Sequence, residues 1–226
     1  MKPMLRLNRV TKTYKNKTVV DNLSIEINEG EVFALLGANG AGKTTTIKMI
    51  LGLTKTSSGD IEIAEDKKIG YSPETPYFPP YLTAMEIMKY YAGLEGDRSK
   101  KDEGYLRGLL ETVGLEDSKT KVRDYSKGMV QRLALAQALI SDPDILILDE
   151  PTAGLDALGR RHNLELLKKM KSEGKTIIIN SHILHDIEAI CDRGIIMKSG
   201  TVIDNWTNGI SHESLEDKFI RLVGEE

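Results

Sequence analysis

The chain has 226 residues, 40% of them hydrophobic and 29% charged, with a formal net charge of −3 at pH 7. This length is enough for one α/β domain with a core of its own, or for a core with a small subdomain, and the composition is that of a globular protein. The slightly acidic balance argues against a large basic surface for nucleic acid and leaves room only for a local basic patch. The single cysteine, Cys191, excludes an internal disulfide. No apolar run reaches the ~20 residues that cross a bilayer, and the N-terminus lacks the apolar core of a signal peptide. We therefore expect a cytoplasmic protein that reaches a membrane only through a partner.

Apolar runs and alternating patterns predict strands over 4–10, 19–27 and 31–36. A glycine-rich turn then leads into a helix over 43–53, and 61–71 is expected to be further strand. The segment 73–80 contains four prolines, so it cannot be a regular element throughout.

Helical patterns follow from 83 to 141. Thr83 and Glu86 predict a capping box, and we expect Gly93 and Gly114 to end the first two helices. The third covers 126–140. Strands and helices then alternate, as strand 145–148, helix 156–172, strand 176–180, helix 183–191 and hairpin 194–204. The order predicts one domain: a parallel-sheet core over about 1–74 and 142–209, a helical insertion over about 75–141, and a short charged helix in the tail 210–226.

A phosphate-binding loop is predicted between the strand 31–36 and the next helix. The segment "GANGAGKTT" fits G-x-x-x-x-G-K-[ST] and has the strand before it and the helix after it that the motif requires. Glycines let backbone N–H groups turn toward a phosphate, the helix N-terminus adds its positive dipole, and the lysine adds a charge. The predicted phosphate-binding residues of this loop are Gly37, Ala38, Asn39, Gly40, Ala41, Gly42, Lys43, Thr44 and Thr45, with the Thr44 hydroxyl as a Mg²⁺ ligand.

Two carboxylates end the strand in "ILILDEPT". Ligands of parallel sheets bind at the carboxyl ends of the strands. We therefore expect Asp149 to hold Mg²⁺, directly or through water, and Glu150 to polarise the attacking water. His182, in the "NSH" that ends the next strand, is positioned to sense a γ-phosphate, although a lone histidine is more often structural.

The segment "YSKGMVQR" gathers a hydroxyl, a cation and a glycine at one helix N-terminus. Together with the phosphate loop, "ILILDEPT", "AGLD" and "NSH", in that order, it resembles the nucleotide-binding subunits of ABC transporters over nearly the whole chain. The resemblance implies an ABC-type P-loop NTPase (RecA-like) core with an antiparallel β subdomain and a helical insertion. It also implies head-to-tail dimers in which the signature residues of one subunit cap the ATP bound by the other. Those signature residues are Ser126, Lys127, Gly128 and Met129.

By the same resemblance, Tyr14 stacks on adenine, Asp156 links the two ATP sites across the dimer, and His182 contacts the γ-phosphate. Lys43 and Glu150 join His182 as the catalytic set. The loop residue that contacts Mg²⁺ is usually glutamine, but here it is Glu74 in "GYSPETP". This variant and the Tyr-Ser-Lys-Gly-Met signature resemble the branch that serves ABC-2-type exporters. The implied partners are ATP, a separate integral membrane permease and a second, identical ATPase subunit. The location implied is the inner face of the cell membrane.

Half of the chain's twelve aromatic residues fall between 71 and 91. In the family this region receives a short helix of the membrane subunit, and we expect Tyr77, Phe78 and Tyr81 to contribute to that groove. The alternative is packing within the helical insertion, above all for Tyr90 and Tyr91.

Other classes of protein fit less well. A non-transport ABC ATPase acting on a macromolecular complex stays open as the main alternative. Ribosome-acting members usually carry two such cores, whereas this chain has one. DNA-repair members insert long coiled coils between the phosphate loop and the acidic strand, and the distance from Lys43 to Asp149 in this chain leaves no room for them. A P-loop kinase or GTPase does not need the signature segment 125–132. A regulatory subunit does not need Lys43, Asp149, Glu150 and His182 together.

Overall fold

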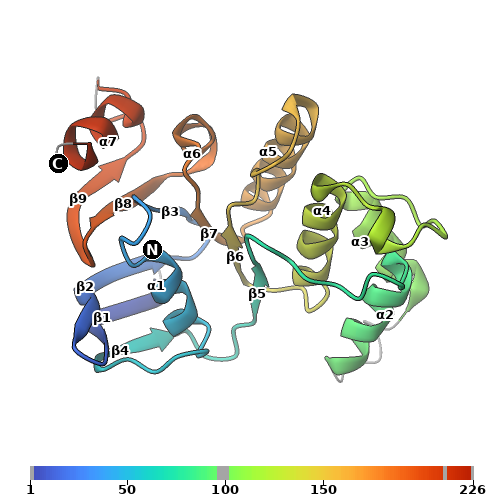
Figure 1. Ribbon diagram of the computed structural model, residues 1–226, viewed down its shortest axis with the longest axis horizontal. Helices are drawn as coiled ribbons and strands as arrows, with labels where there is room; N and C mark the ends of the chain where they lie inside the picture. The colour runs from blue at the N-terminus through green and yellow to red at the C-terminus, as the bar shows by residue number, and fades with distance from the viewer. Residues whose placement is uncertain (1–2, 96–101, 211–212, 225–226) are drawn as a thin grey trace. The chain divides into compact units, whose positions relative to one another are not determined.

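The computed structural model describes residues 3–95, 102–210 and 213–224 (Figure 1). They form two compact units, one made of Met1–Lys67 with Lys171–Glu226 and the other of Lys68–Met170. Both units combine helices with strands, so the predicted α/β class is confirmed. Within these described residues, no helix is long and apolar enough to cross a membrane.

The first unit contains an antiparallel sheet in the order β2-β1-β4. Its strands are β1 (Pro3–Tyr14), β2 (Lys17–Asn28) and β4 (Ser58–Ile63). Leu5 pairs with Ile27 on one side and with Ile63 on the other. Apolar residues recur on one face and are buried there, at Leu5, Leu7, Leu23 and Ile27. This alternation is what a sheet with one solvated face requires.

The same unit contains a second group of strands, in which β3 (Val32–Gly37) lies between β7 (Thr176–Asn180) and β8 (Arg193–Lys198), parallel to both. β9 (Thr201–Thr207) returns antiparallel to β8. Every residue of β7 is buried, as continuous apolar runs predict for a parallel strand covered on both faces. Leu35 pairs with Asn180, so the loops that follow β3 and β7 leave from the same edge.

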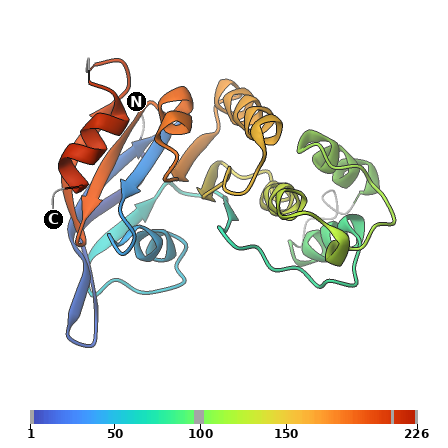
Figure 2. The ribbon, with the colours of Figure 1, turned by 45° about the horizontal axis from the view of Figure 1, so that its top comes forward.

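Three helices belong wholly to the first unit: α1 (Lys43–Ile50), α6 (Leu184–Ile190) and α7 (Leu215–Val223). In Figure 2, α7 runs alongside β9, and Lys218 joins them through an ion pair with Asp204 at 2.9 Å. This confirms the predicted helix in the tail; residues 211–212 and 225–226 of that segment lie outside the described residues. Cys191, just after α6, is buried, and burial raises the pKa of its thiol.

The second unit joins a short parallel pair of strands to three packed helices (Figure 1). β5 (Ile69–Ser72) pairs with β6 (Ile145–Asp149), and the helices are α2 (Ala84–Leu94), α3 (Glu103–Thr112) and α4 (Lys127–Ala138). Most of α5 (Ala157–Ser172) completes the unit. Each of these three helices contributes fully buried apolar residues, namely Met88, Leu106, Leu110 and Leu133. Gly70 lets α4 approach β5, because a side chain there would overlap the Ala138 carbonyl oxygen.

Four predictions about where helices and strands begin and end can be compared with the structure: two are wrong and two are confirmed. The segment 61–71 is not one strand, because β4 ends at Ile63 and β5 begins at Ile69 in a different sheet. Gly93 does not end α2, which continues through Leu94; one glycine inside a helix costs only about 1 kcal/mol. The capping box is present, with Thr83 Oγ1 accepting from Glu86 N–H at 3.2 Å and Glu86 accepting from Thr83 N–H at 2.7 Å. Gly114, at φ 70°, follows the end of α3 as expected.

Candidate functional site

The phosphate loop of the first unit connects β3 to α1. Gly42, at φ 106°, caps α1 with no side-chain hydrogen bond, so the first-turn N–H groups are oriented outward from the helix start. The Lys43 ammonium folds back over the loop and donates to the carbonyls of Gly37 at 2.6 Å and Ala38 at 3.1 Å. Thr44, in the first turn, is exposed. The loop therefore gathers a cation, a hydroxyl and a helix N-terminus, which together suit a phosphate.

Neighbouring backbone explains why glycines are needed in this loop. A Cβ on Gly37 would overlap the Met197 carbonyl oxygen and lie 2.9 Å from the Ala41 Cβ. A Cβ on Gly42 would lie 2.7 Å from the Val19 carbonyl oxygen. Strands β2 and β8 therefore press on the loop at two points. Gly40 differs, since at φ 83° a Cβ there would meet nothing within 4 Å.

Substitution by alanine is expected to destabilise the protein more at Gly37 than at Gly40. Gly37→Ala should lower the free energy of unfolding by about 3 kcal/mol, because backbone atoms must move to admit the methyl group. Gly40→Ala should lower it by only about 1 kcal/mol, the cost of a left-handed alanine in open space. Urea unfolding of both variants measures the difference, and equal losses would mean that the neighbouring backbone does not hold the loop.

Two further predicted residues belong to the first unit. Tyr14 ends β1, with 44% of its surface exposed and the Lys12 ammonium 4.8 Å from its ring centroid. A half-exposed ring of this kind can stack on a base. His182 is exposed directly after β7. Because β7 and β3 are parallel neighbours, His182 and the phosphate loop leave from the same edge of this sheet.

In the second unit, Glu74 and Asp149 follow paired strands. Asp149 is the last residue of β6 and is buried, whereas Glu74 follows β5 and is exposed. Burial, and then the Asp149 and Glu74 carboxylates, raise the pKa of the Tyr71 hydroxyl to about 12. β5 and β6 run parallel and pair up to Ser72 and Leu148, so both carboxylates follow the same edge and provide hard oxygen donors there. No group of three or more His, Cys, Asp and Glu side chains forms a metal cage within the described ranges.

Glu150 has an unusual backbone. It is buried, at 8% exposure, and its φ is +53°, a left-handed conformation that costs a non-glycine residue on the order of 1–3 kcal/mol. Its carbonyl accepts from the Ala153 N–H at 3.1 Å and from Gln131 Nε2 at 3.4 Å. The next carbonyl, of Pro151, accepts from Asn163 Nδ2 at 2.8 Å. Strain of this kind persists where surrounding contacts hold it, and it is frequent at active sites.

The signature segment begins α4. Ser126 is the N-cap, with its Oγ accepting from the Met129 N–H at 3.2 Å, and Ser126 and Lys127 are exposed. The Lys127 side chain lies over Gly154 of "AGLD", since a Cβ on Gly154 would be 2.7 Å from Lys127 Cδ. A Cβ on Gly128 would be 3.0 Å from Leu155 Cδ2. The signature and the "AGLD" segment of one chain are therefore packed together.

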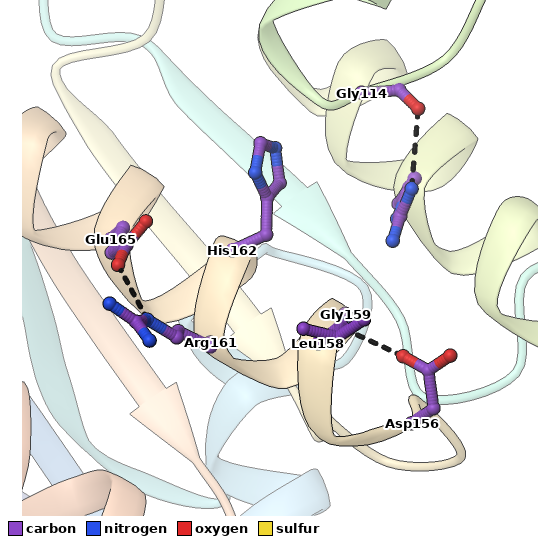
Figure 3. A pocket seen from close by; sticks show the side chains of 8 residues that line it. Gly114, Asp156, Leu158, Gly159, Arg161, His162 and Glu165 are labelled. Atoms are coloured by element: carbon purple, nitrogen blue, oxygen red, sulfur yellow. Dashed lines mark hydrogen bonds and ion pairs between the residues drawn. The ribbon is translucent and has the colours of Figure 1, made fainter.

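Asp156 lies beside an open pocket of about 500 Å³ in the second unit (Figure 3). Its carboxylate accepts from the Gly159 N–H at 2.7 Å at the start of α5. The Arg132 guanidinium, another lining group, donates to the Gly114 carbonyl at 3.2 Å. These contacts fix the ends of α3 and α5 while the Asp156 side chain stays exposed.

The aromatic segment contains two kinds of residue. Tyr77 and Tyr81 are 82% and 68% exposed, as a contact surface requires. Phe78 differs from expectation, because it is only 6% exposed and packs edge to face on Tyr91 at 6.2 Å between centroids. Tyr90 is 61% exposed, so the alternative of packing within the helical insertion does not hold for this residue. Spacing alone could not separate Tyr77 from Phe78, since the segment 73–80 has no period.

Gln131 and Asn163, the partners of the Glu150 segment, were not predicted from the sequence. Each is a polar residue on the buried side of a helix, Gln131 four residues before buried Leu135 and Asn163 between buried Gly159 and Leu167. A buried amide usually has a fixed hydrogen-bond partner, so this misfit in the apolar pattern is the signal that could have found them.

Comparisons with known proteins agree on one family. The ABC transporter family profile matches residues 20–153, more than half of the chain. An uncharacterized ABC transporter ATP-binding protein of Bacillus subtilis, YxlF, is 41% identical over 88% of this chain and 69% of its own length. The Nod factor export ATP-binding protein I of Cupriavidus metallidurans is 35% identical over 100% of this chain and 78% of its own.

A solved structure extends this agreement to the fold. The ATP-binding cassette MJ0796, a dimer bound to ADP and Pi after hydrolysis, superposes with a TM-score of 0.82. It is 28% identical over 90% of this chain and 98% of its own. The family profile, the relatives and the fold agree, and the chain belongs to the ATP-binding, ATP-hydrolysing subunits of ABC transporters.

Proposed function

We propose that two copies of this chain close around two ATP molecules and drive export through a separate membrane subunit. The observation that carries the proposal is the phosphate loop, in which left-handed glycines and the Lys43 ammonium surround a helix N-terminus. The dimeric cassette MJ0796 and the Nod factor export relative support the dimer and the direction of transport. The membrane partner binds the chain at the cytoplasmic face of the cell membrane.

Nucleotide binding is assigned to the first unit. Tyr14 stacks on adenine, the residues Gly37 to Thr45 surround the phosphates, and Lys43 compensates the charge of the β- and γ-phosphates. His182 contacts the γ-phosphate from its exposed position after β7. An exposed ring and an exposed imidazole can both meet a ligand without moving core residues.

Hydrolysis is assigned to carboxylates of the second unit. Water attacks the γ-phosphorus, the bond to the bridging oxygen of ADP breaks, and the Glu150 carboxylate orients the water and takes its proton. Thr44, Asp149 and Glu74 offer oxygen donors that fit Mg²⁺, a cation that keeps several waters and few protein ligands. When bound, this ion neutralises charge on the phosphates. Glu74 in place of glutamine leaves an extra negative charge beside them.

The trans contact is assigned to the signature. Ser126, Lys127, Gly128 and Met129 surround an exposed helix start, which presents N–H groups, a hydroxyl and an ammonium to the phosphate bound by the second subunit. Asp156 ends the "AGLD" segment, and the Lys127 side chain packs on Gly154 of that segment. We assign to Asp156 the link between the two ATP sites across the dimer.

Substitution of two exposed tyrosines tests whether the aromatic segment binds the membrane subunit. Tyr77→Ser with Tyr81→Ser should weaken co-purification with the membrane subunit at least about tenfold, because buried tyrosines are frequent energetic centres of interfaces. ATP hydrolysis by the isolated chain should not change. Ile210→Ser, which removes an equally exposed apolar side chain from the other compact unit, is the control. Undiminished co-purification of the tyrosine variant would exclude this surface as the contact.

A further inference from the structure

One side chain of the signature helix contacts the backbone of two other functional segments. Gln131, in the second turn of α4, is 3% exposed. Its Nε2 lies 3.4 Å from the Glu150 carbonyl oxygen and 3.5 Å from the Pro73 carbonyl oxygen. Pro73 directly precedes Glu74. A single buried amide therefore connects α4 to the segments that carry Glu150 and Glu74, all within one compact unit.

The Glu150 segment needs such a connection because of its backbone conformation. Glu150 has a left-handed φ of +53°, so its peptide does not follow the ordinary preference of its residue type. Gln131 holds the Glu150 carbonyl and Asn163 holds the Pro151 carbonyl at 2.8 Å, so two helices hold adjacent peptides. The two Gln131 distances are long for N–H to O bonds, and one amide group serves both acceptors. Gln131 therefore orients the two carbonyl groups through weak hydrogen bonds.

The other end of the Gln131 amide contributes little to stability. Gln131 Oε1 is buried with no hydrogen-bond partner among the described protein groups. A buried polar atom without a partner lowers stability. Gln131 also lines a small cavity of about 10 Å³, together with Leu148, Pro151 and Asn163. The two long hydrogen bonds of Nε2 and the unpaired Oε1 therefore oppose each other in their effect on stability, so the amide adds little net stability.

We propose that Gln131 is a positioning residue for hydrolysis: it holds the Glu150 peptide, and through it the carboxylate, in register with the signature helix. This inference rests on the proposed role of Glu150 in activating water. Since α4 begins at Ser126, which contacts the ATP of the opposite site in the proposed dimer, Gln131 also ties the two ATP sites together inside one subunit. When the signature of one subunit binds the ATP held by its partner, Gln131 orients the Glu150 carboxylate that acts on the ATP held by its own subunit.

Gln131→Met tests the proposal because it keeps the length of the side chain, removes the N–H donor and removes the unpaired oxygen. We expect kcat for ATP hydrolysis to fall by about tenfold to a hundredfold, as misplacement of a reacting group does. The affinity for ATP should stay within about twofold. The melting temperature should change by only a few degrees, because removing the unpaired oxygen offsets part of the two lost hydrogen bonds. Gln131→Leu should show the same loss. Gln137→Met, in the last turn of α4, is the matched control and should retain the wild-type rate.

A double-mutant cycle separates positioning from a general effect. If Gln131 acts through Glu150, adding Gln131→Met to Glu150→Gln should not lower the single-turnover rate further. An equal loss in both backgrounds, or a normal kcat for Gln131→Met, would overturn the positioning role. If the wild-type chain fails to hydrolyse ATP, or if Glu150→Gln hydrolyses it normally, the proposed function fails instead, so the two failures are distinguishable.

Discussion

Glu150→Gln is expected to lower the rate of ATP hydrolysis by roughly 10²- to 10⁴-fold, the contribution of a general base, while ATP still binds. Glutamine has the same shape but cannot accept the proton of the attacking water. The Glu150 side chain is buried, so no bulk water or neighbouring exposed carboxylate can easily replace it. Phosphate release under saturating Mg-ATP measures the rate, and equilibrium dialysis measures the binding.

The control for this substitution is Glu116→Gln, which makes the same chemical change at an exposed glutamate of the same compact unit. It should hydrolyse ATP at the wild-type rate. Hydrolysis by Glu150→Gln within about threefold of wild type would remove Glu150 from the role of base and leave water activation to another group.

Ser126→Arg is expected to abolish the dimer that Mg-ATP forms in the Glu150→Gln protein, weakening association more than about 100-fold. The arginine replaces the small hydroxyl at an exposed helix start, where the proposed partner's γ-phosphate must approach closely. It fills that space and removes the cap of α4. Sedimentation with Mg-ATP and with Mg-ADP measures the dimer, which should form only with ATP in the parent protein.

Loss of the cap alone must be distinguished from loss of the interface. Ser214→Arg provides the control, because Ser214 is also an exposed N-cap, with its Oγ accepting from the Asp217 N–H at 3.1 Å. Each substitution should destabilise its helix by about 1 kcal/mol. Only Ser126→Arg should prevent association. A normal ATP-dependent dimer in Ser126→Arg would place the trans contact elsewhere on the chain.

The parts of the molecule that the sequence predicted are those in which neighbouring residues decide the structure. The phosphate loop is one, because an apolar strand, its glycines and the helix start are continuous from Val32 to Ile50. The Thr83 capping box is another, since both partners lie within one helical turn. The acidic end of β6 follows from an apolar run that two carboxylates interrupt. Each of these needs no information from distant segments.

The parts that were not predicted depend on segments far apart in the chain. Gln131 reaches the Pro73 and Glu150 carbonyls, and neither partner is its neighbour in sequence. The left-handed φ of Glu150 is held by such contacts, and nothing in "LDEPT" indicates it. Phe78 is buried because Tyr91 of α2 packs on it, whereas its neighbour Tyr77 has no such cover. Composition identified the aromatic segment but could not sort its members.

The state of Cys191 has a practical consequence for spectroscopy. The thiol is buried, and burial, followed by the nearby Asp192 charge, raises its pKa, so almost none of it is the reactive thiolate at neutral pH. Because it is the chain's single cysteine, the natural protein should give almost no background with maleimide reagents. A cysteine introduced at an exposed position such as Leu158 would then carry the only probe, and spin labels there would report the separation of two subunits through the ATP cycle.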